Sequence, residues 1–318
     1  MDRRSFMMTA SMLATLPVAT HASRPIPSPG VKGPYLDLTT GKGTMMALAR
    51  MDGDLDESKV KYGGATGIVS AVRANEKVRD LFGFEVLSVG ALRKQPDGSY
   101  RVLHRETIFY TDLATDQILT EFDNPFTGEK VKVVDVINDP WNLHIEEFEP
   151  LPPSYGGLNK VEAKDRKPHI LNWRELGGQI VAQRGINLFY PSALQPDKWP
   201  RESAGKMAQV SEMYSFVIQT SDMQNPNLTS ITYSGSWSRV TPWLPWMLMG
   251  QAPGHILYQS VSYNGVPLSQ LKPQVVAHAE KFHPHMLEPP PLESFQKPNL
   301  SSLENYALTQ KPAPVPKS

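Results

Sequence analysis

The chain has 318 residues, and its 32 basic and 32 acidic side chains give a formal net charge of zero. This balance lacks the positive charge with which proteins bind nucleic acids or anionic membranes, so we predict neither a nucleic-acid partner nor stable membrane insertion. The chain has no cysteine, which excludes disulfides, thiolate nucleophiles and cysteine-ligated metal centres.

The first 22 residues have the layout of a twin-arginine export signal. Arg3 and Arg4 precede an apolar run over residues 7–18, and small residues ending at Ala22 follow it. A run of about a dozen residues is too short to span a bilayer. We therefore predict a signal peptide over residues 1–22, cleavage after Ala22, and a periplasmic protein exported by the twin-arginine machinery.

The first half of the remaining chain has the pattern of short strands joined by turns. Residues 23–44, rich in Pro, Gly and Thr, predict an irregular arm, and the pattern becomes strand-like from Met45. Turn signals such as the Pro-Asp-Gly-Ser of residues 96–99 recur between the apolar segments. This rhythm indicates an antiparallel meander. The expected strands cover residues 67–73, 84–92, 100–110, 117–122 and 130–136.

The second half follows a connection rich in Pro, Gly and Lys at residues 149–168. Strands are expected at residues 213–219 and 229–238, and a hairpin at residues 255–266. Within 229–238, Tyr233, Gly235 and Trp237 alternate with Ser and Thr, which places them on one face. Residues 271–282 have apolar side chains at helical spacing, and the Pro-rich residues 286–318 predict an extended or disordered tail.

These elements predict one mainly β domain over residues 45–285. Its fold class is an antiparallel calycin-like barrel or open β-sandwich with a short C-terminal helix. Such a barrel would open to a ligand at one end of its strands.

A polar cluster follows the expected strand at 130–136. Trp141 and His144 lie there beside Asn and Asp residues. His144 is therefore the candidate general acid or base, and Trp141 a candidate ligand contact. A histidine that is only hydrogen-bonded is the alternative.

The segment from Trp243 to Met249 is the most apolar short stretch. Its residues Trp243, Trp246 and Met247 could plug the barrel, line a pocket for an apolar or aromatic ligand, or touch a membrane. Trp237 and Arg239 lead into it, and Arg239 could hold an anionic group of the ligand.

Four further side chains complete the predicted site. Trp173 and Tyr190 are candidate pocket residues, and Arg174 and Tyr258 are candidate catalytic groups. A surface ion pair is the alternative for Arg174.

Metal and cofactor motifs are weak. The acidic turn at residues 52–57 lacks the glycine of a calcium loop. His278, His283 and His285 have no carboxylate nearby at an obvious ligand spacing. The sequence also lacks a Gly-rich nucleotide loop. We expect no metal and no cofactor.

Several of these segments resemble a bacterial and fungal family, the domain-of-unknown-function family 1838. The resemblance implies a single domain, and bacterial members of that family often carry twin-arginine leaders. It implies no mechanism. The matching segments are residues 109–112, 121–129, 138–141, 235–239, 242–247 and 254–258.

Three functions are consistent with these features. The first is a cofactor-independent lyase, isomerase or hydrolase acting on a lipophilic or aromatic small molecule. The second is a non-catalytic periplasmic binding or carrier protein for an apolar ligand. The third is an interaction protein that uses residues 243–249 as its interface. The sequence favours them in this order.

Overall fold

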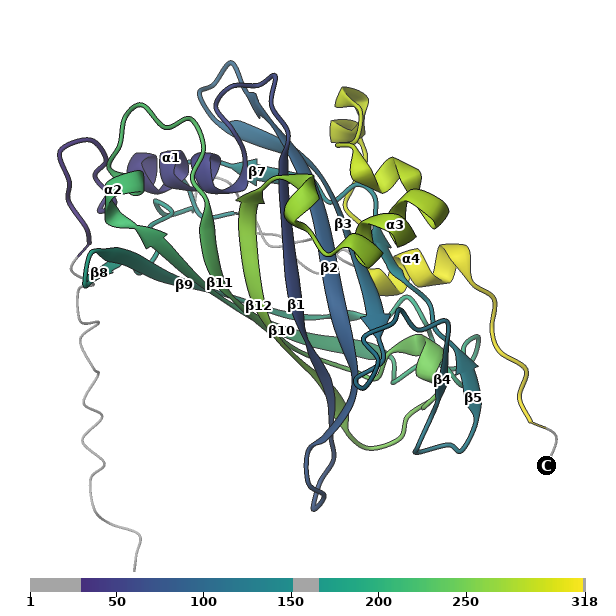
Figure 1. The fold of residues 1–318 in the computed structure, drawn as a ribbon. Coiled ribbons are helices and arrows are strands. Elements are labelled where there is room, and N and C mark those ends of the chain that lie inside the picture. The colour runs from purple at the N-terminus through teal and green to yellow at the C-terminus, as the bar shows by residue number, and fades with distance from the viewer. Residues whose placement is uncertain (1–29, 151–165, 317–318) are drawn as a thin grey trace, which may run out of the picture.

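The computed structural model describes residues 30–150 and 166–316, and Figure 1 shows its fold. The predicted signal peptide lies outside these residues, as does most of the predicted connection at 149–168. In the part of the chain that the structure describes, no helix is long and apolar enough to cross a membrane.

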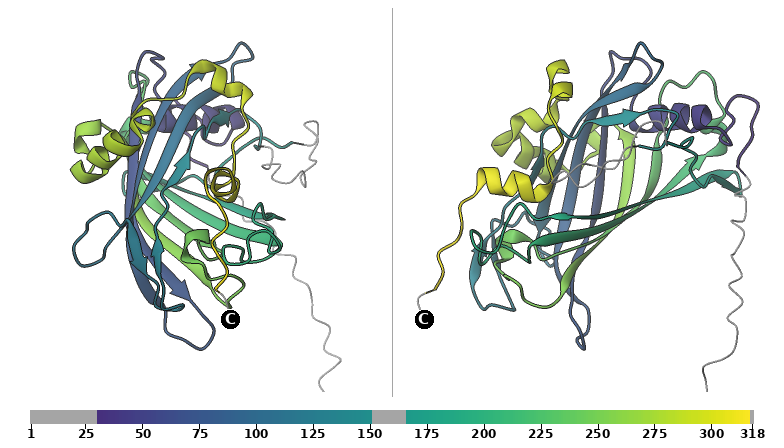
Figure 2. Two further views of the ribbon diagram at one scale, coloured as in Figure 1. Left: turned by 90° about the vertical axis from the view of Figure 1, so that its right-hand side faces the viewer. Right: turned by 180° about the vertical axis from the view of Figure 1, so that it is seen from behind.

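A ten-stranded antiparallel sheet forms the body of the protein, in the order β6-β3-β2-β1-β12-β11-β10-β9-β8, with β7 also paired to β3. Figures 1 and 2 show that this sheet curls into a trough with a concave and a convex face. The strands are β1 (Lys61–Val72), β2 (Arg79–Lys94), β3 (Tyr100–Thr111), β6 (Val136–Asn138), β7 (Leu143–Ile145), β8 (Arg174–Leu176), β9 (Gln179–Pro191), β10 (Met207–Gln219), β11 (Tyr233–Thr241) and β12 (His255–Val266).

The predicted fold class is confirmed as mainly antiparallel β with a short C-terminal helix. The sheet does not close into a barrel among the described strands, because β6 and β8 are its two edges and do not pair with each other. A separate two-stranded ribbon, β4 (Glu121–Asp123) and β5 (Lys130–Lys132), lies off the main sheet.

The alternation predicted around residues 233–237 is the local reason for strand β11. Tyr233 and Trp237 are partly buried and alternate with exposed Ser234 and Ser236. The predicted hairpin at residues 255–266 is wrong, because the segment is a single strand that pairs with β1 and β11 along its length. The Asn-Gly signal instead marks the strand end, where Gly265 has φ 84°.

Helix α1 (Gly41–Asp52) lies where the irregular arm was predicted to end and the strand-like pattern to begin, at Met45. The side chain of Thr40 caps its first turn by accepting a hydrogen bond from the Gly43 N–H. Ala47, Leu48 and Met51 are buried, and their spacing is that of the inner face of a helix. Figure 2 shows α1 on the concave side, at one end of the trough.

Two C-terminal helices cover opposite faces of the sheet (Figure 2). The predicted helix at 271–282 is confirmed as α3 (Pro273–Phe282), which packs against Leu87 and Phe109 on the convex face. The extended tail is a wrong prediction for residues 302–309, which form α4 (Ser302–Thr309) behind a Ser301–Glu304 capping box. Short helical turns occupy α2 (Thr220–Met223), η3 (Pro245–Met247), η4 (Leu268–Gln270), η5 (Pro284–Leu287) and η6 (Leu292–Gln296).

Helix α4 bridges the two sides of the trough. Leu303 packs beside Tyr190 of β9, and the Asn305 Nδ2 donates to Asn138 Oδ1 of β6 at 3.2 Å. The helix therefore joins strands that lie far apart in the order of the sheet.

Two hydrophobic cores occupy the concave side. One packs α1 against the strands around Trp173, Ile218 and Ile231. The other gathers aromatic side chains around Phe82 and Trp246. Along β10, the inward positions Ile218 and Phe216 belong to the first core, and the next inward positions along the strand are Tyr214 and Glu212. Polar side chains therefore begin where this core ends.

Candidate functional site

Charged and polar side chains from five strands meet on the concave face. Cross-strand pairing opposes Glu106 of β3 to Asn138 of β6, and Glu212 of β10 to Arg239 of β11. We refer to the group as the carboxylate cluster. It consists of Glu106, Asn138, Glu212, Tyr214, Trp237, Arg239 and Tyr258.

Glu212 is held by several donors. The Trp237 Nε1 donates to Glu212 Oε2 at 3.1 Å, and the Tyr214 hydroxyl donates a short hydrogen bond to the same oxygen. Arg239 Nε lies 3.7 Å from Glu212 Oε1. Two hydrogen bonds and one ion pair are an arrangement that suits a carboxylate anion.

Glu106 has a different environment. Asn138 Nδ2 donates to Glu106 Oε1 at 3.2 Å, and this is its one hydrogen bond within the described part of the chain. Burial raises the pKa of Glu106 to about 7, the charge of Glu212 adds to the rise, and the Asn138 hydrogen bond and Arg239 oppose it. Glu106 therefore exists in both protonation states near neutral pH.

Helix α4 orients the amide beside Glu106. Because Asn305 donates to the amide oxygen of Asn138, the amide NH2 group of Asn138 is directed at Glu106. The position of this carboxyl group thus depends on the bridge that α4 makes across the trough.

One nitrogen of the Arg239 guanidinium makes no hydrogen bond to any described residue. Its Nε has no hydrogen-bond partner among the residues that the structure describes, although it forms the ion pair with Glu212. The side chains of Arg239 and Glu212 are 19% and 16% exposed, although the Nε atom of Arg239 is itself buried. Other atoms of the two side chains therefore border solvent.

Tyrosines and tryptophan form the aromatic part of the cluster. The hydroxyls of Tyr110 and Tyr258 are 2.9 Å apart, and the rings of Trp237 and Tyr258 are 5.4 Å apart. Burial raises the pKa of Tyr258 to about 12, and burial with the charge of Glu212 raises the pKa of Tyr214 well above its ordinary value. Both phenols are therefore neutral donors at physiological pH.

Four of the residues predicted from the sequence lie on this concave face. Trp237, Arg239 and Tyr258 belong to the cluster, and Tyr190 is buried on the neighbouring strand β9 beside α4. The structure therefore brings together residues that are up to about 70 positions apart, as expected of one site.

Four other predicted pocket residues lie in the hydrophobic cores. Trp173 is fully buried and donates from Nε1 to Thr44 Oγ1 of α1 at 3.0 Å. Trp243, Trp246 and Met247 are buried in the second core. For the apolar segment at 243–249, the packing therefore favours the role of a core plug.

Three predicted residues lie away from the cluster. His144 opposes Arg101 across the β3–β7 pair and lies 3.3 Å from Glu146 through its Nδ1, on the convex face. Arg174 is exposed on the edge strand β8. Trp141 is partly buried and its backbone N–H donates to His104 O at 2.8 Å.

The sequence analysis missed the two carboxylates that distinguish the site. Glu106 occupies an inward position between Val102 and Tyr110, where the parity of the strand expects an apolar side chain. Glu212 likewise alternates with Val210 and Phe216. The sequence signal for such a residue is a charged side chain at a position of a long strand where the alternation places side chains in the core.

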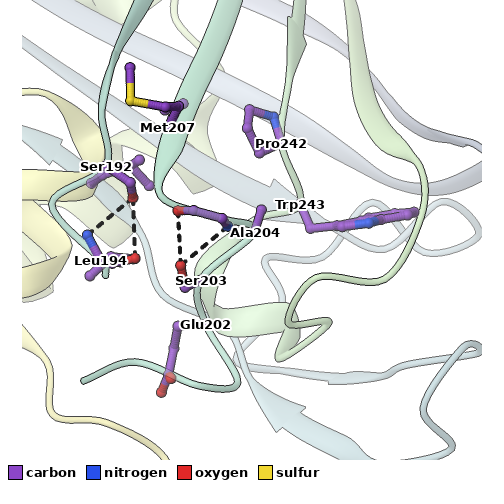
Figure 3. Close-up of a pocket in the computed structure, with 11 residues that line it drawn as sticks. Ser192, Leu194, Glu202, Ser203, Ala204, Met207, Pro242 and Trp243 are labelled. Atoms are coloured by element: carbon purple, nitrogen blue, oxygen red, sulfur yellow. Dashed lines mark hydrogen bonds between the residues drawn. The ribbon is translucent and has the colours of Figure 1, made fainter. Parts of the chain in front are cut away.

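Figure 3 shows a small pocket, where the ends of β9 and β10 meet Trp243 and Leu303. Its hydroxyl groups serve local turns. Ser192 Oγ accepts a hydrogen bond from the Leu194 N–H, and Ser203 Oγ accepts one from the Gly205 N–H. This pocket therefore offers less chemistry than the carboxylate cluster.

One group of side chains has the spacing of metal ligands. Asp135, His278 and His283 place their ligand atoms within 4.8 Å of one another. They lie at α3 on the convex face, on the other side of the sheet from the carboxylate cluster.

Comparison with known families identifies the chain. The model of DUF1838, a family described as proteins of unknown function, matches residues 61–309. The chain therefore belongs to this family, as its motifs had suggested. No curated protein matches the chain.

Proposed function

We propose that this member of the DUF1838 family is an enzyme that performs acid–base chemistry on a small organic molecule at the carboxylate cluster. Glu106 would transfer the proton, and Trp237, Arg239 and Glu212 would bind the substrate. The reaction class is that of a lyase, isomerase or hydrolase that uses no redox cofactor.

The observation that carries this proposal is the contrast between the two carboxylates. Two hydrogen bonds and an ion pair converge on Glu212, whereas Glu106 accepts one hydrogen bond from a neutral amide. A pair of acids in such different environments can divide the roles of fixed charge and proton carrier. A group with a pKa of about 7 can take up and return a proton within one turnover.

The lining of the cluster favours a neutral ligand with an aromatic or apolar body. The partly buried ring of Trp237 offers flat apolar surface, and the guanidinium of Arg239 offers donors. Tyr258 is 2% exposed and packs against Trp237 from the second core. Because Glu212 balances the charge of Arg239, the site has no net positive charge to attract an anion. This differs from the sequence-based expectation that Arg239 holds an anionic group.

The proposal is tested first without a substrate. Infrared spectroscopy should detect a protonated carboxyl group that disappears between pH 6 and 8, within about a unit of the pKa of Glu106, and that is missing in Glu106→Gln. Turnover is then screened with neutral aromatic esters, lactones and hydroxy ketones, which cover the three reaction classes.

Variants decide which group performs the chemistry. Glu106→Gln should lower kcat about 100-fold or more and leave binding, measured by tryptophan fluorescence, nearly unchanged. His144→Ala, which changes the histidine predicted from the sequence, should turn over normally. The opposite result for the two variants would refute the proposal. Tight binding without turnover in every class would support the carrier function instead.

We also propose that the protein is exported to the periplasm by the twin-arginine route. The support is the order of features in residues 1–22 and the lack of cysteine, since a protein without disulfides needs no oxidative folding after export. Replacing Arg3 and Arg4 by lysines should keep the protein inside the cell. Normal export of this variant would contradict the proposal.

A further inference from the structure

Two histidine rings and one aspartate converge on a single point of the convex face. The Nε2 atoms of His278 and His283 lie 3.1 Å and 3.2 Å from the same oxygen, Asp135 Oδ2. His278 belongs to α3, His283 is its C-terminal cap, and Asp135 precedes β6. We infer that these three side chains form a binding site for one divalent transition-metal ion of the Zn²⁺ type.

The distances agree with coordination to a common ion. Ligand atoms about 2.1 Å from a metal are separated by about 3.0 Å in an octahedral site and about 3.4 Å in a tetrahedral one. The two separations at Asp135 fall in this interval, and all three ligand atoms lie within 4.8 Å of one another. Both histidines also present the same nitrogen, Nε2, to the shared point.

The packing around the rings orients them for binding. The ring of Phe109 lies edge-on to His278 at 4.7 Å and stacks on His283 at 6.1 Å. The backbone N–H of His283 donates to Ala279 O at 2.8 Å and continues the last turn of α3. Surrounding contacts that fix a ligand ring raise the metal affinity of a site because less freedom is lost on binding.

Partial exposure leaves a route for the ion. The side chains of His278, Asp135 and His283 are 14%, 19% and 24% exposed. Arg105, on the same face of the sheet, is paired with a carboxylate: its Nε lies 2.7 Å from Asp139 Oδ1, and His285 Nε2 lies 3.6 Å from Asp139 Oδ2. The cation of Arg105 is therefore compensated and does not repel a metal ion.

The ligand set indicates the class of ion. Two imidazoles and one carboxylate suit Zn²⁺, Co²⁺, Ni²⁺ or Fe²⁺ and are a poor match for Ca²⁺ or Mg²⁺, which prefer oxygen ligands. Three protein ligands leave at least one coordination position for water. The bound ion would fasten α3 and its C-terminal cap to the segment that leads into β6 and Asn138.

The proposed site differs from the sequence-based expectation of no metal. No carboxylate lies near the histidines at an obvious spacing in the sequence, because Asp135 is 143 residues upstream of His278. His285, the third histidine of the sequence motif, is paired with Asp139 and is not one of the three ligands.

The test uses the purified full chain stripped of metal with a chelator, and Zn²⁺ or Co²⁺ alone as the probe. Calorimetry should find one Zn²⁺ per chain, and a 100-fold excess of Zn²⁺ over its Kd should raise the melting temperature by roughly 5 °C. Binding should weaken as the pH falls below about 6, because protons compete for the imidazoles. Bound Co²⁺ should show the absorption of nitrogen and oxygen ligands.

Substitutions locate the ion. His278→Gln and Asp135→Asn should each weaken Zn²⁺ binding at least tenfold, and the double variant His278→Gln, His283→Gln should abolish it. His144→Gln is the matched control, because His144 also faces a carboxylate, Glu146, at 3.3 Å. Its Zn²⁺ affinity should be unchanged.

Two results would overturn the inference. One is a wild-type protein that binds no Zn²⁺ or Co²⁺, which would make the three side chains a hydrogen-bonded group only. The other is undiminished binding in the double variant. If the variants do not fold, the wild-type protein alone provides the test. One Zn²⁺ bound per chain, together with shifts of two histidine resonances when Zn²⁺ is added, would then support the site. These outcomes are independent of Glu106, so they do not test the proposed enzyme.

Discussion

Two regions of the concave side bury charge, and they use it differently. At the α1 end, Arg50 is fully buried, and each of its three side-chain nitrogens donates to backbone oxygens. Its Nε donates to Leu228 O, its Nη1 to Met223 O, and its Nη2 to Asp222 O and Asn225 O, at 2.7–3.0 Å. This arginine ties α1 to the chain between α2 and β11.

Lys61 completes the α1 region in the same manner. Its Nζ donates to Arg50 O at 2.9 Å and to Ile231 O at 2.7 Å. Burial lowers the pKa of Lys61 to about 7, which matches the pKa of Glu106 in the carboxylate cluster. A shifted pKa therefore does not by itself distinguish a functional group from a structural one.

The difference between the regions lies in unused hydrogen-bonding capacity. The donors of Arg50 and Lys61 end on backbone oxygens, whereas Arg239 has an Nε without a hydrogen-bond partner among the described residues. The side chains of Glu212 and Arg239 are also partly exposed. We therefore assign the α1 region to the fold and propose the carboxylate cluster as the ligand site.

The largest effect is expected from Arg50→Met. Four carbonyl oxygens from Asp222 to Leu228 would lose a charged donor in a buried place. The free energy of unfolding should fall by about 4 kcal/mol, measured by urea denaturation. The exposed Arg174→Met is the control and should change it by less than about 0.5 kcal/mol. Equal effects would show that Arg50 does not anchor α1.

The same contrast explains how much could be predicted from the sequence. Strands β1, β2 and β3 were found because apolar alternation and turn signals agree there. Helix α1 was missed because its glycines and the preceding Pro-rich arm suggested irregular chain, although Ala47, Leu48 and Met51 have helical spacing. Strand β9 was missed because Arg184 and Gly185 interrupt its apolar alternation near the middle.

The candidate site was only half predictable for a physical reason. Trp237, Arg239 and Tyr258 attracted notice because large aromatic residues and arginine are common in pockets. Glu106 and Glu212 occupy inward positions of their own strands, but only the register of the strands shows that they meet on the concave face. Register between distant strands depends on the whole sheet, and a single sequence does not show it.

A smaller effect is expected from Glu106→Gln, and it depends on pH. The pKa of Glu106 is about 7 in the folded protein, against an ordinary value of 4.5. The folded state therefore binds the proton more tightly, so the contribution of Glu106 to stability is full below pH 4.5 and is lost as the pH rises through 7. Relative to the wild type, Glu106→Gln should gain about 2 kcal/mol between pH 4.5 and 8, after allowance for solvent screening.

Comparing Glu106→Gln with the wild type cancels the contribution of the other titrating groups to the pH dependence of stability. His104, whose pKa burial lowers to about 4, titrates in the same range but is present in both. Chemical denaturation at pH 4.5, 6 and 8 gives the difference at each pH. A difference that stays constant with pH would mean that Glu106 has an ordinary pKa, and the proposed proton carrier would be lost.

The smallest effect is expected from the electrostatic interaction between Glu106 and Glu212. The charge of Glu212 is the second cause of the raised pKa of Glu106, after burial. In Glu212→Gln this repulsion disappears and Arg239 is free to attract Glu106, so the pKa of Glu106 should fall toward its ordinary value. The gain from Glu106→Gln at pH 8 should then shrink by about 0.5–1 kcal/mol in a double-mutant cycle.

Since Glu212 also holds Tyr214 and Trp237, the single variant should be destabilised whatever the coupling, and only the cycle isolates the interaction. A coupling of zero would mean that the two acids do not sense each other, and the contrast in protonation between Glu106 and Glu212 would then come from burial and hydrogen bonds alone.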